Sequence, residues 1–167
     1  LEDDAVLEDG RLGDVGAAAR LIAGRRLAVR LVSEPRPSIR VWRELGGGAC
    51  LGLPTRSGNL TTAYLVTREA AAELLASSER FDRPVDDFMG CAQWHGVDVL
   101  HLEPFAARHP AGPSEIGARA KPAVGAWFKV RREWLRLGRV LRDRLGRLGS
   151  RRRLGLLLSP SEPPRAP

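Results

Sequence analysis

The chain has 167 residues, a length typical of one domain that buries a core of its own without disulfide bonds. Hydrophobic residues make up 43% and charged residues 28%, ordinary proportions for a globular protein, and no apolar run approaches the roughly 18–20 residues of a membrane span. The two cysteines, Cys50 and Cys91, are too few for a disulfide framework or a cysteine-type zinc site, and we expect both to be reduced core thiols in a cytosolic protein.

The positive charge of the chain is confined to one segment. The net charge of +7 would by itself indicate nucleic acid or an anionic membrane as a partner. Residues 129–153, however, hold eleven basic side chains against two acidic ones, Glu133 and Asp143, for a local net charge of +9. The rest of the chain is mildly acidic at −2, so the body and the basic segment need separate explanations.

The first residues, LEDD, have the character of a strand end whose beginning lies upstream, since a strand normally has about five or six residues. We therefore expect the chain to be the latter part of a larger domain. Residues 5–27 are predicted to be helical, with Asp14 as the N-cap and Gly24 near the end of the helix.

Three short strands are predicted next, over residues 27–32, 39–45 and 49–53. A turn with prolines at both ends, at 35–37, separates the first two, and three consecutive glycines at 46–48 separate the last two. These short apolar runs, each bounded by turn residues, are typical of buried strands.

Residues 61–67 (TTAYLVT) are rich in β-branched and aromatic side chains, as strands are. They lead directly into a strong helix over 68–77, for which Thr67 is the expected N-cap. Residues 84–87 open a further short helix or turn, and residues 97–102 alternate as a strand does. The alternation of strands and helices predicts an α/β layered fold.

Residues 126–149 form the clearest amphipathic helix, because large apolar side chains recur every three or four positions. The members of this apolar stripe are Trp127, Val130, Trp134, Leu137, Leu141, Leu145 and Leu148. The chain then ends in a leucine run and a proline-rich tail, for which we expect disorder over 154–167.

Three interpretations of the basic helix stay open. A membrane-surface helix has basic residues on one side and Trp, Phe and Leu on the other, as here. Alternatively, the apolar stripe packs on the domain and the arginines are solvated. Nucleic acid is the least favoured partner, because the tryptophans lie on the apolar stripe and are not interleaved with the arginines for base stacking.

The acidic cluster Glu2-Asp3-Asp4 is the first candidate site. Three adjacent carboxylates at the end of a strand repel one another, and a divalent cation that also contacts substrate phosphates would offset that repulsion. The alternative is a solvated acidic turn. His109, in a loop before a proline, is the better candidate ligand among the histidines, whereas His101 is expected to serve packing or surface display.

The second candidate is Asp86-Asp87, which follows Pro84. Two adjacent carboxylates at a helix start could act as a general base or bind a substrate hydroxyl. The alternative is helix capping by Asp86, with Asp87 complementing the helix dipole.

Four segments in this order resemble glycosyltransferase family 25, the lipooligosaccharide and procollagen galactosyltransferase group. LEDDAVL resembles the strand-terminal EDD motif of that family, and TTAYLVTREAAAELL is similar to its threonine–tyrosine segment. RPVDDFM is similar to its Pro-hydrophobic-Asp motif, and the stretch LHLEPF…SEIG resembles its closing element. The four segments lie at 1–7, 61–75, 83–89 and 100–117.

The resemblance implies a GT-A type nucleotide-sugar fold, a UDP-sugar donor and a divalent metal, usually Mn²⁺ with Mg²⁺ as the alternative. It implies metal binding by Asp4 and Glu2, to which we add His109 as the histidine candidate. It also implies that Asp86, with Asp87 beside it, lies near the acceptor hydroxyl as the catalytic carboxylate. The donor would be bound by Glu2, Asp3, Thr61, Thr62 and Tyr64.

The sequence thus predicts a family 25-like domain, N-terminally incomplete, over residues 1–121, a basic amphipathic helix over 122–153, and the tail. The expected function is transfer of a hexose, with galactose favoured, to a cell-envelope glycolipid in lipopolysaccharide biosynthesis. The alternative is an inactive remnant that binds a membrane surface through its basic helix. We expect a cytoplasmic location, with peripheral attachment to the inner membrane as an open alternative.

Overall fold

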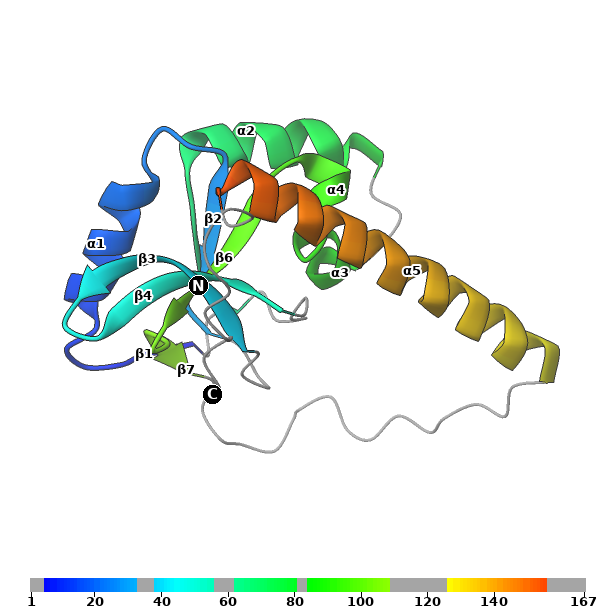
Figure 1. Ribbon diagram of the computed structural model, residues 1–167, viewed down its shortest axis with the longest axis horizontal. Helices are drawn as coiled ribbons and strands as arrows, with labels where there is room; N and C mark the ends of the chain where they lie inside the picture. The colour runs from blue at the N-terminus through cyan, green and yellow to red at the C-terminus, as the bar shows by residue number, and fades with distance from the viewer. Residues whose placement is uncertain (1–4, 33–37, 56–61, 81–83, 109–125, 156–167) are drawn as a thin grey trace.

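The computed structural model describes residues 5–32, 38–55, 62–80, 84–108 and 126–155. Its centre is a five-stranded sheet (Figure 1). β2 and β6 run parallel, and the other neighbouring pairs are antiparallel. The strands lie in the order β3 (Ile39–Gly46), β4 (Ala49–Pro54), β6 (Asp98–Glu103), β2 (Leu27–Arg30) and β5 (Tyr64–Val66).

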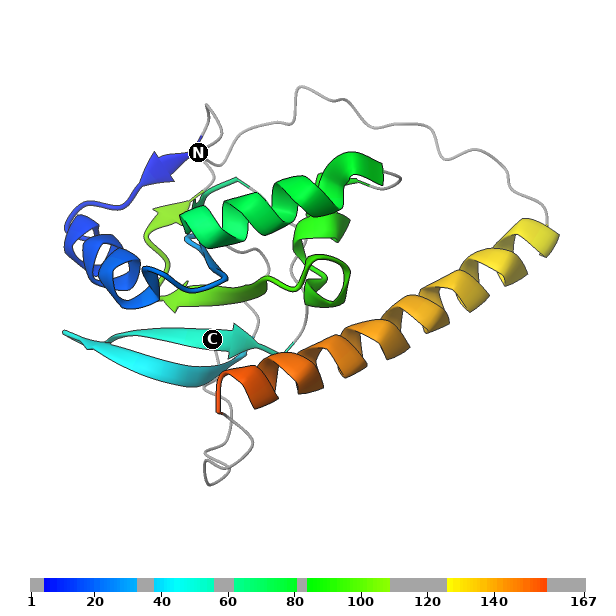
Figure 2. The same cartoon turned by 90° about the horizontal axis from the view of Figure 1, so that it is seen from above.

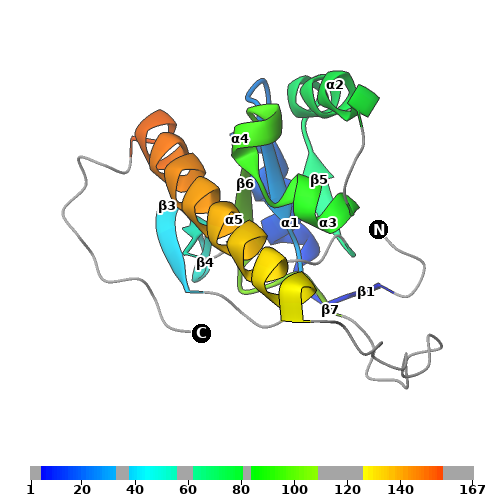
Figure 3. The ribbon, with the colours of Figure 1, turned by 90° about the vertical axis from the view of Figure 1, so that its right-hand side faces the viewer.

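Helices lie on both sides of this sheet, so the α/β prediction is confirmed. Figure 3 shows α5 in front of the sheet and α1 behind it. Two short strands, β1 (Val6–Leu7) and β7 (Ala107–Arg108), pair separately in an antiparallel ribbon. The helices are α1 (Leu12–Ile22), α2 (Arg68–Ser77), α3 (Val85–Met89), α4 (Ala92–His95) and α5 (Ala126–Arg153), and a 3₁₀ turn at Ser78–Arg80 follows α2.

The start of α2 follows the sequence prediction closely. The hydroxyl of Thr67 accepts a hydrogen bond from the backbone N–H of Ala70 at 3.1 Å, as an N-cap does, and it donates to the carbonyl of Arg25 at 2.6 Å. This one side chain therefore begins the helix and also ties it to the segment that leads into β2. The strand before it is shorter than the predicted 61–67, since pairing covers only Tyr64–Val66.

The apolar core lies on the face of the sheet that α1 covers. Val29, Leu51 and Leu100 are fully buried there and belong to the same apolar cluster as Ala18 and Ile22 of α1. The free thiols of Cys50 and Cys91 are also buried, as predicted. This face has the close-packed apolar composition that drives folding.

The opposite face is covered by α2, α4 and the last turns of α5, and it is less apolar. Ala28, Ala70 and Val97 form a small buried cluster beneath α2. Next to this cluster, towards the ends of β2 and β6, the buried side chains are those of Arg30 and His101. The second face therefore places polar groups where the first face places leucine and valine.

The N-terminal prediction of one helix over 5–27 is wrong in two respects. Val6 and Leu7 form a strand, and the helix begins only at Leu12, after Arg11 as the N-cap. Asp14 is inside the first turn, where its carboxylate accepts from the Arg11 guanidinium at 3.1 Å instead of capping the helix.

The helix α5 leaves the body of the protein along most of its length (Figure 2). Six members of the predicted apolar stripe are exposed: Trp127 (78%), Trp134 (71%), Leu137, Leu141, Leu145 and Leu148. The side chain of the remaining member, Val130, is outside the described part of the chain. The stripe of α5 thus does not pack on the domain at those six positions. Within the described residues, no helix is both long enough and apolar enough to cross a membrane.

Candidate functional site

Three strands bring polar residues together in one row across the second face. Arg30 of β2 pairs in register with Tyr64 of β5 on one side and with His101 of β6 on the other. Gly52 of β4 is the register partner of His101 and continues the row. Since register partners on neighbouring strands point to the same side of a sheet, Arg30 and His101 share the face on which α4 and α5 lie.

Arg30 is a buried cation whose terminal nitrogens are not used by the described part of the protein. Its exposed fraction is 3%, and its Nη1 and Nη2 atoms make no hydrogen bond there. Burial lowers the pKa of Arg30, and the carboxylate of Asp86 and the thiol of Cys91 act in the opposite direction. The guanidinium nonetheless stays protonated, because arginine does not lose its proton in proteins.

His101 is the neutral neighbour of Arg30. Its exposed fraction is 1%, and its Nδ1 has no hydrogen-bond partner among the described residues. Burial and the positive charge of Arg30 lower the pKa of His101 to about 3. His101 therefore carries no charge at neutral pH, and its unpaired ring nitrogen can donate or accept one hydrogen bond.

His95 shows what a purely structural histidine looks like in the same fold. It is equally buried, but its Nε2 lies 3.0 Å from the carbonyl of Phe88 and its Nδ1 accepts from the backbone N–H of Val97 at 3.1 Å. Burial lowers the pKa of His95 as well. Both ring nitrogens of His95 are satisfied, whereas His101 keeps one unused.

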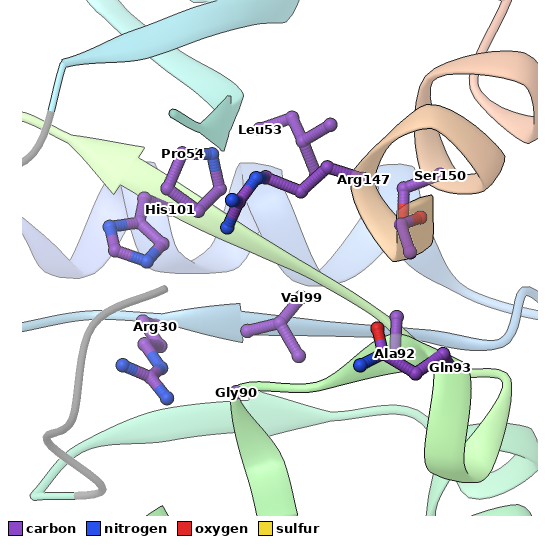
Figure 4. Close-up of a pocket in the computed structure, with 11 residues that line it drawn as sticks. Arg30, Leu53, Pro54, Gly90, Ala92, Gln93, Val99, His101, Arg147 and Ser150 are labelled. Atoms are coloured by element: carbon purple, nitrogen blue, oxygen red, sulfur yellow. The ribbon is translucent and has the colours of Figure 1, made fainter. Parts of the chain in front are cut away.

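Arg30 and His101 border a pocket between the sheet and α5 (Figure 4). The pocket encloses about 440 Å³ of empty space, part of it open to solvent. Its polar lining comprises Arg30, His101, Gln93, Arg147 and Ser150, and the rest is apolar or glycine. In Figure 4, Arg30 and His101 lie towards one end of the pocket and Ser150 towards the other, with the Arg147 side chain extending from α5.

Further positive charge gathers beside the pocket. Burial and the nearby charges of Arg40 and Arg147 lower the pKa of Arg151. The Nε of Arg151 has no hydrogen-bond partner in the described part of the chain. Like charges held together in this way favour an anion nearby.

A polar clamp fixes the last turns of α5 to the sheet. Asp98, at the start of β6, is almost fully buried. Its carboxylate accepts hydrogen bonds from the Ser150 hydroxyl at 2.5 Å and from Nε of Arg153 at 2.9 Å. The same ion pair raises the pKa of Arg153. The clamp thereby holds the Arg147 and Ser150 side of the pocket against the strands.

The predicted catalytic carboxylates lie in the first turn of α3. Asp86 and Asp87 are half-buried, and neither is the N-cap, which is Pro84. The capping alternative for Asp86 is thus wrong, although both acidic side chains complement the positive end of the helix dipole. Asp86 interacts electrostatically with Arg30 but is not among the residues that line the pocket.

The other sequence candidates divide into two groups. Thr62 is buried and Tyr64 is 39% exposed, and neither lines the pocket. Glu2, Asp3, Asp4, Thr61 and His109 lie outside the described residues, so the predicted metal ligands are not placed. Within the residues that are described, no group of three or more His, Cys, Asp or Glu side chains could hold a metal ion.

Arg30 is a site residue that was not predicted from the sequence. One feature of the sequence could have identified it: the arginine lies in the middle of LAVRLV, a run that otherwise consists of strand-forming apolar residues. A charged residue inside a strand that is buried on both faces is rare unless the charge has a partner or a ligand.

Comparisons with protein-family models, with characterised protein sequences and with solved structures gave no match.

Proposed function

We propose that this chain forms part of a metal-dependent glycosyltransferase with a GT-A type fold that resembles family 25. It would transfer a hexose, with galactose as the first candidate, from a UDP-sugar to a glycolipid acceptor such as the lipopolysaccharide core. The site of action would be the cytoplasmic face of the inner membrane.

The observation that carries this proposal is the convergence of three of the four family-like segments on Arg30. Tyr64, from the second segment, is the register partner of Arg30 on one side, and His101, from the fourth segment, is its register partner on the other. Asp86, from the third segment, attracts Arg30 electrostatically. Segments that are separated by up to about 40 residues in sequence therefore meet at one place, as the parts of a binding site do.

Asp86 is the proposed catalytic carboxylate. In hexose transfer, a carboxylate near the acceptor hydroxyl accepts its proton or orients its oxygen towards the sugar carbon. Bound Mn²⁺ would offset charge on the departing diphosphate. Its proposed ligands, Glu2, Asp4 and His109, lie outside the described residues.

The test is transfer from UDP-galactose by the full-length protein with Mn²⁺ and a lipooligosaccharide acceptor, measured as UDP release. We expect Asp86→Asn to lower kcat about 100-fold or more, as loss of a general base does. Glu79→Gln removes an exposed carboxylate after α2 and should leave kcat unchanged. The proposal fails if the wild-type protein releases no UDP, or if Asp86→Asn is as active as the wild type.

A second candidate function rests on the exposed stripe of α5. We propose that α5 binds the surface of an anionic membrane, with Trp127 and Trp134 at the headgroup level and the basic side chains toward the lipid phosphates. Charge complementarity selects this occupant, because residues 129–153 carry a net charge of +9. Each basic residue near an anionic leaflet contributes about 1 kcal/mol.

Vesicle sedimentation tests membrane binding by α5 independently of any transferase activity. Wild-type protein should sediment with phosphatidylglycerol vesicles and much less with phosphatidylcholine vesicles, and added salt should release it. Trp127→Ser combined with Trp134→Ser should weaken binding, whereas Leu12→Ser, at an exposed position of α1, should not. Equal sedimentation of the double variant and the wild type would refute the membrane role of α5, as would preferential capture by duplex DNA.

A further inference from the structure

We infer that the pocket between the sheet and α5 binds a compact oxyanion, a phosphate or carboxylate group of a small ligand, through the guanidinium of Arg30. Neither Asp86 nor Asp87 lines this pocket, and the inference stands whether or not the protein transfers a sugar.

Arg30 has hydrogen-bonding capacity that the described part of the protein does not use. An isolated charge in a protein interior is expensive, and buried polar groups are normally hydrogen-bonded. Arg30 is 3% exposed, yet Nη1 and Nη2 have no hydrogen-bond partner among the described residues. Both nitrogens are terminal donors of a side chain that borders a pocket, which is where a ligand would use them.

The polar groups around Arg30 have the chemistry of an anion-binding site. A guanidinium offers parallel N–H donors that match the two oxygens of a carboxylate or phosphate. His101 adds a neutral ring nitrogen without a partner in the described structure. Arg147 borders the same pocket from α5 and adds a second positive charge, whereas the hydroxyl proton of Ser150 is already donated to Asp98. This combination of donors suits an oxyanion and does not suit a cation.

Positive charge exceeds negative charge among the described residues near the pocket. The carboxylate of Asp86 attracts Arg30 but makes no hydrogen bond to its terminal nitrogens. Arg151 lies close enough to Arg40 and to Arg147, which is on the pocket wall, for their charges to interact. A bound anion would satisfy Arg30 and reduce this repulsion at the same time.

The pocket also depends on α5 being in place. One wall consists of Arg147, Ser150 and the backbone at Gly146, which the contact of Ser150 and Arg153 with Asp98 holds against the sheet. Binding of the anion should therefore strengthen the attachment of α5, and loss of the clamp should weaken binding.

Histidine-selective NMR tests the inference, because the chain has three histidines. The probes are inorganic phosphate and glucuronate, with galactose as the neutral sugar, all at constant ionic strength. We expect phosphate, glucuronate or both to shift the ring signals of His101 in a saturable way, and galactose to leave them unchanged. The response to each anion identifies which oxyanion the pocket prefers. The ring signals of His95, which is fully hydrogen-bonded, report that the fold is intact.

Arg30→Met should abolish the response of His101, and Arg20→Met, at an exposed arginine of α1, should retain it. If Arg30→Met fails to fold, Arg30→Lys keeps the charge without the planar fork and should raise the Kd at least tenfold. The inference is overturned if neither anion gives a saturable shift in the wild type, if galactose shifts His101 as strongly, or if the folded Arg30 variants respond like the wild type.

Discussion

The two faces of the central sheet are built for different tasks. On the α1 face, fully buried aliphatic side chains such as Val29, Leu51 and Leu100 form a continuous core. On the other face, the neighbouring positions along the same strands hold Arg30 and His101, which are equally buried but have polar atoms without partners in the described structure. Adjacent residues of one strand, such as Val29 and Arg30, thus serve stability and binding respectively.

The second face is less stable than the α1 face because it buries polar side chains. A strand alternates between faces, so one sequence can place an apolar side chain in the core and the next residue in a pocket. On the α1 face, every buried methyl group adds to the stability of the fold. On the second face, the desolvation of a cation and an imidazole lowers that stability. A local loss of stability of this kind is typical of functional sites.

Neighbouring substitutions on β6 give the largest expected contrast between the faces. Leu100→Ala removes a fully buried side chain from the core and should lower the free energy of unfolding by about 3 kcal/mol. Val99→Ala, at a half-buried position that lines the pocket, should cost less than about 1.5 kcal/mol. Urea denaturation measures both, and equal losses would contradict the assignment of the core to the α1 face.

Acid should weaken the second face selectively. Since the pKa of His101 is about 3 in the folded protein and about 6.5 when unfolded, the unfolded state binds more protons between these values. Stability is therefore complete above about pH 6.5 and falls as the pH is lowered towards 3, by about 2 kcal/mol between pH 6.5 and pH 4.5.

His95, whose pKa is also lowered, should add to this acid sensitivity. Replacing His101 by glutamine should flatten the pH dependence of the free energy of unfolding but leave the part that belongs to His95. An unchanged slope in His101→Gln would show that His101 is not the neutral buried group described above.

Loss of the clamp should detach the last turns of α5 from the sheet, and it should lower the free energy of unfolding by less than Leu100→Ala does. Asp98→Asn leaves an amide against Arg153, and because Arg153 is half-exposed, solvent screening limits the loss to about 1–2 kcal/mol. Hydrogen exchange should speed up in the last two turns of α5 and stay slow in α1. Asp14→Asn, which breaks a partly exposed pair on α1, is the matched control, and protection of α5 that survives Asp98→Asn would refute the clamp.

Much of the fold was predictable because it depends on local signals. Thr67 predicts the start of α2 through the hydrogen bond that its hydroxyl accepts. The three glycines at 46–48 predict the turn that joins β3 and β4, and all three have positive φ, including Gly47 at 59°. The strand pair β1–β7 was missed, because two residues of strand gain their identity only from a partner about 100 residues away.

The candidate site was predictable only in part. Carboxylates such as Asp86 are conspicuous in a sequence, whereas the importance of Arg30 depends on which helix covers which face of the sheet. The clamp could not be predicted either, because it joins Asp98 to Ser150 and Arg153 across more than 50 residues. The amphipathic helix α5 was predicted from its apolar stripe, but the contacts that attach this helix to the sheet are polar ones.

The most direct measurement is the free energy of unfolding of the wild type and Arg30→Met, each with and without phosphate at constant ionic strength. Without phosphate, we expect Arg30→Met to be more stable by about 1 kcal/mol, because methionine fills the site without a buried charge that has no hydrogen-bond partner. With phosphate, the wild type should gain stability and the variant should not, so that the difference shrinks or reverses. If Arg30→Met is instead less stable by the same amount in both buffers, Arg30 is a structural residue and the second face binds no anion through it.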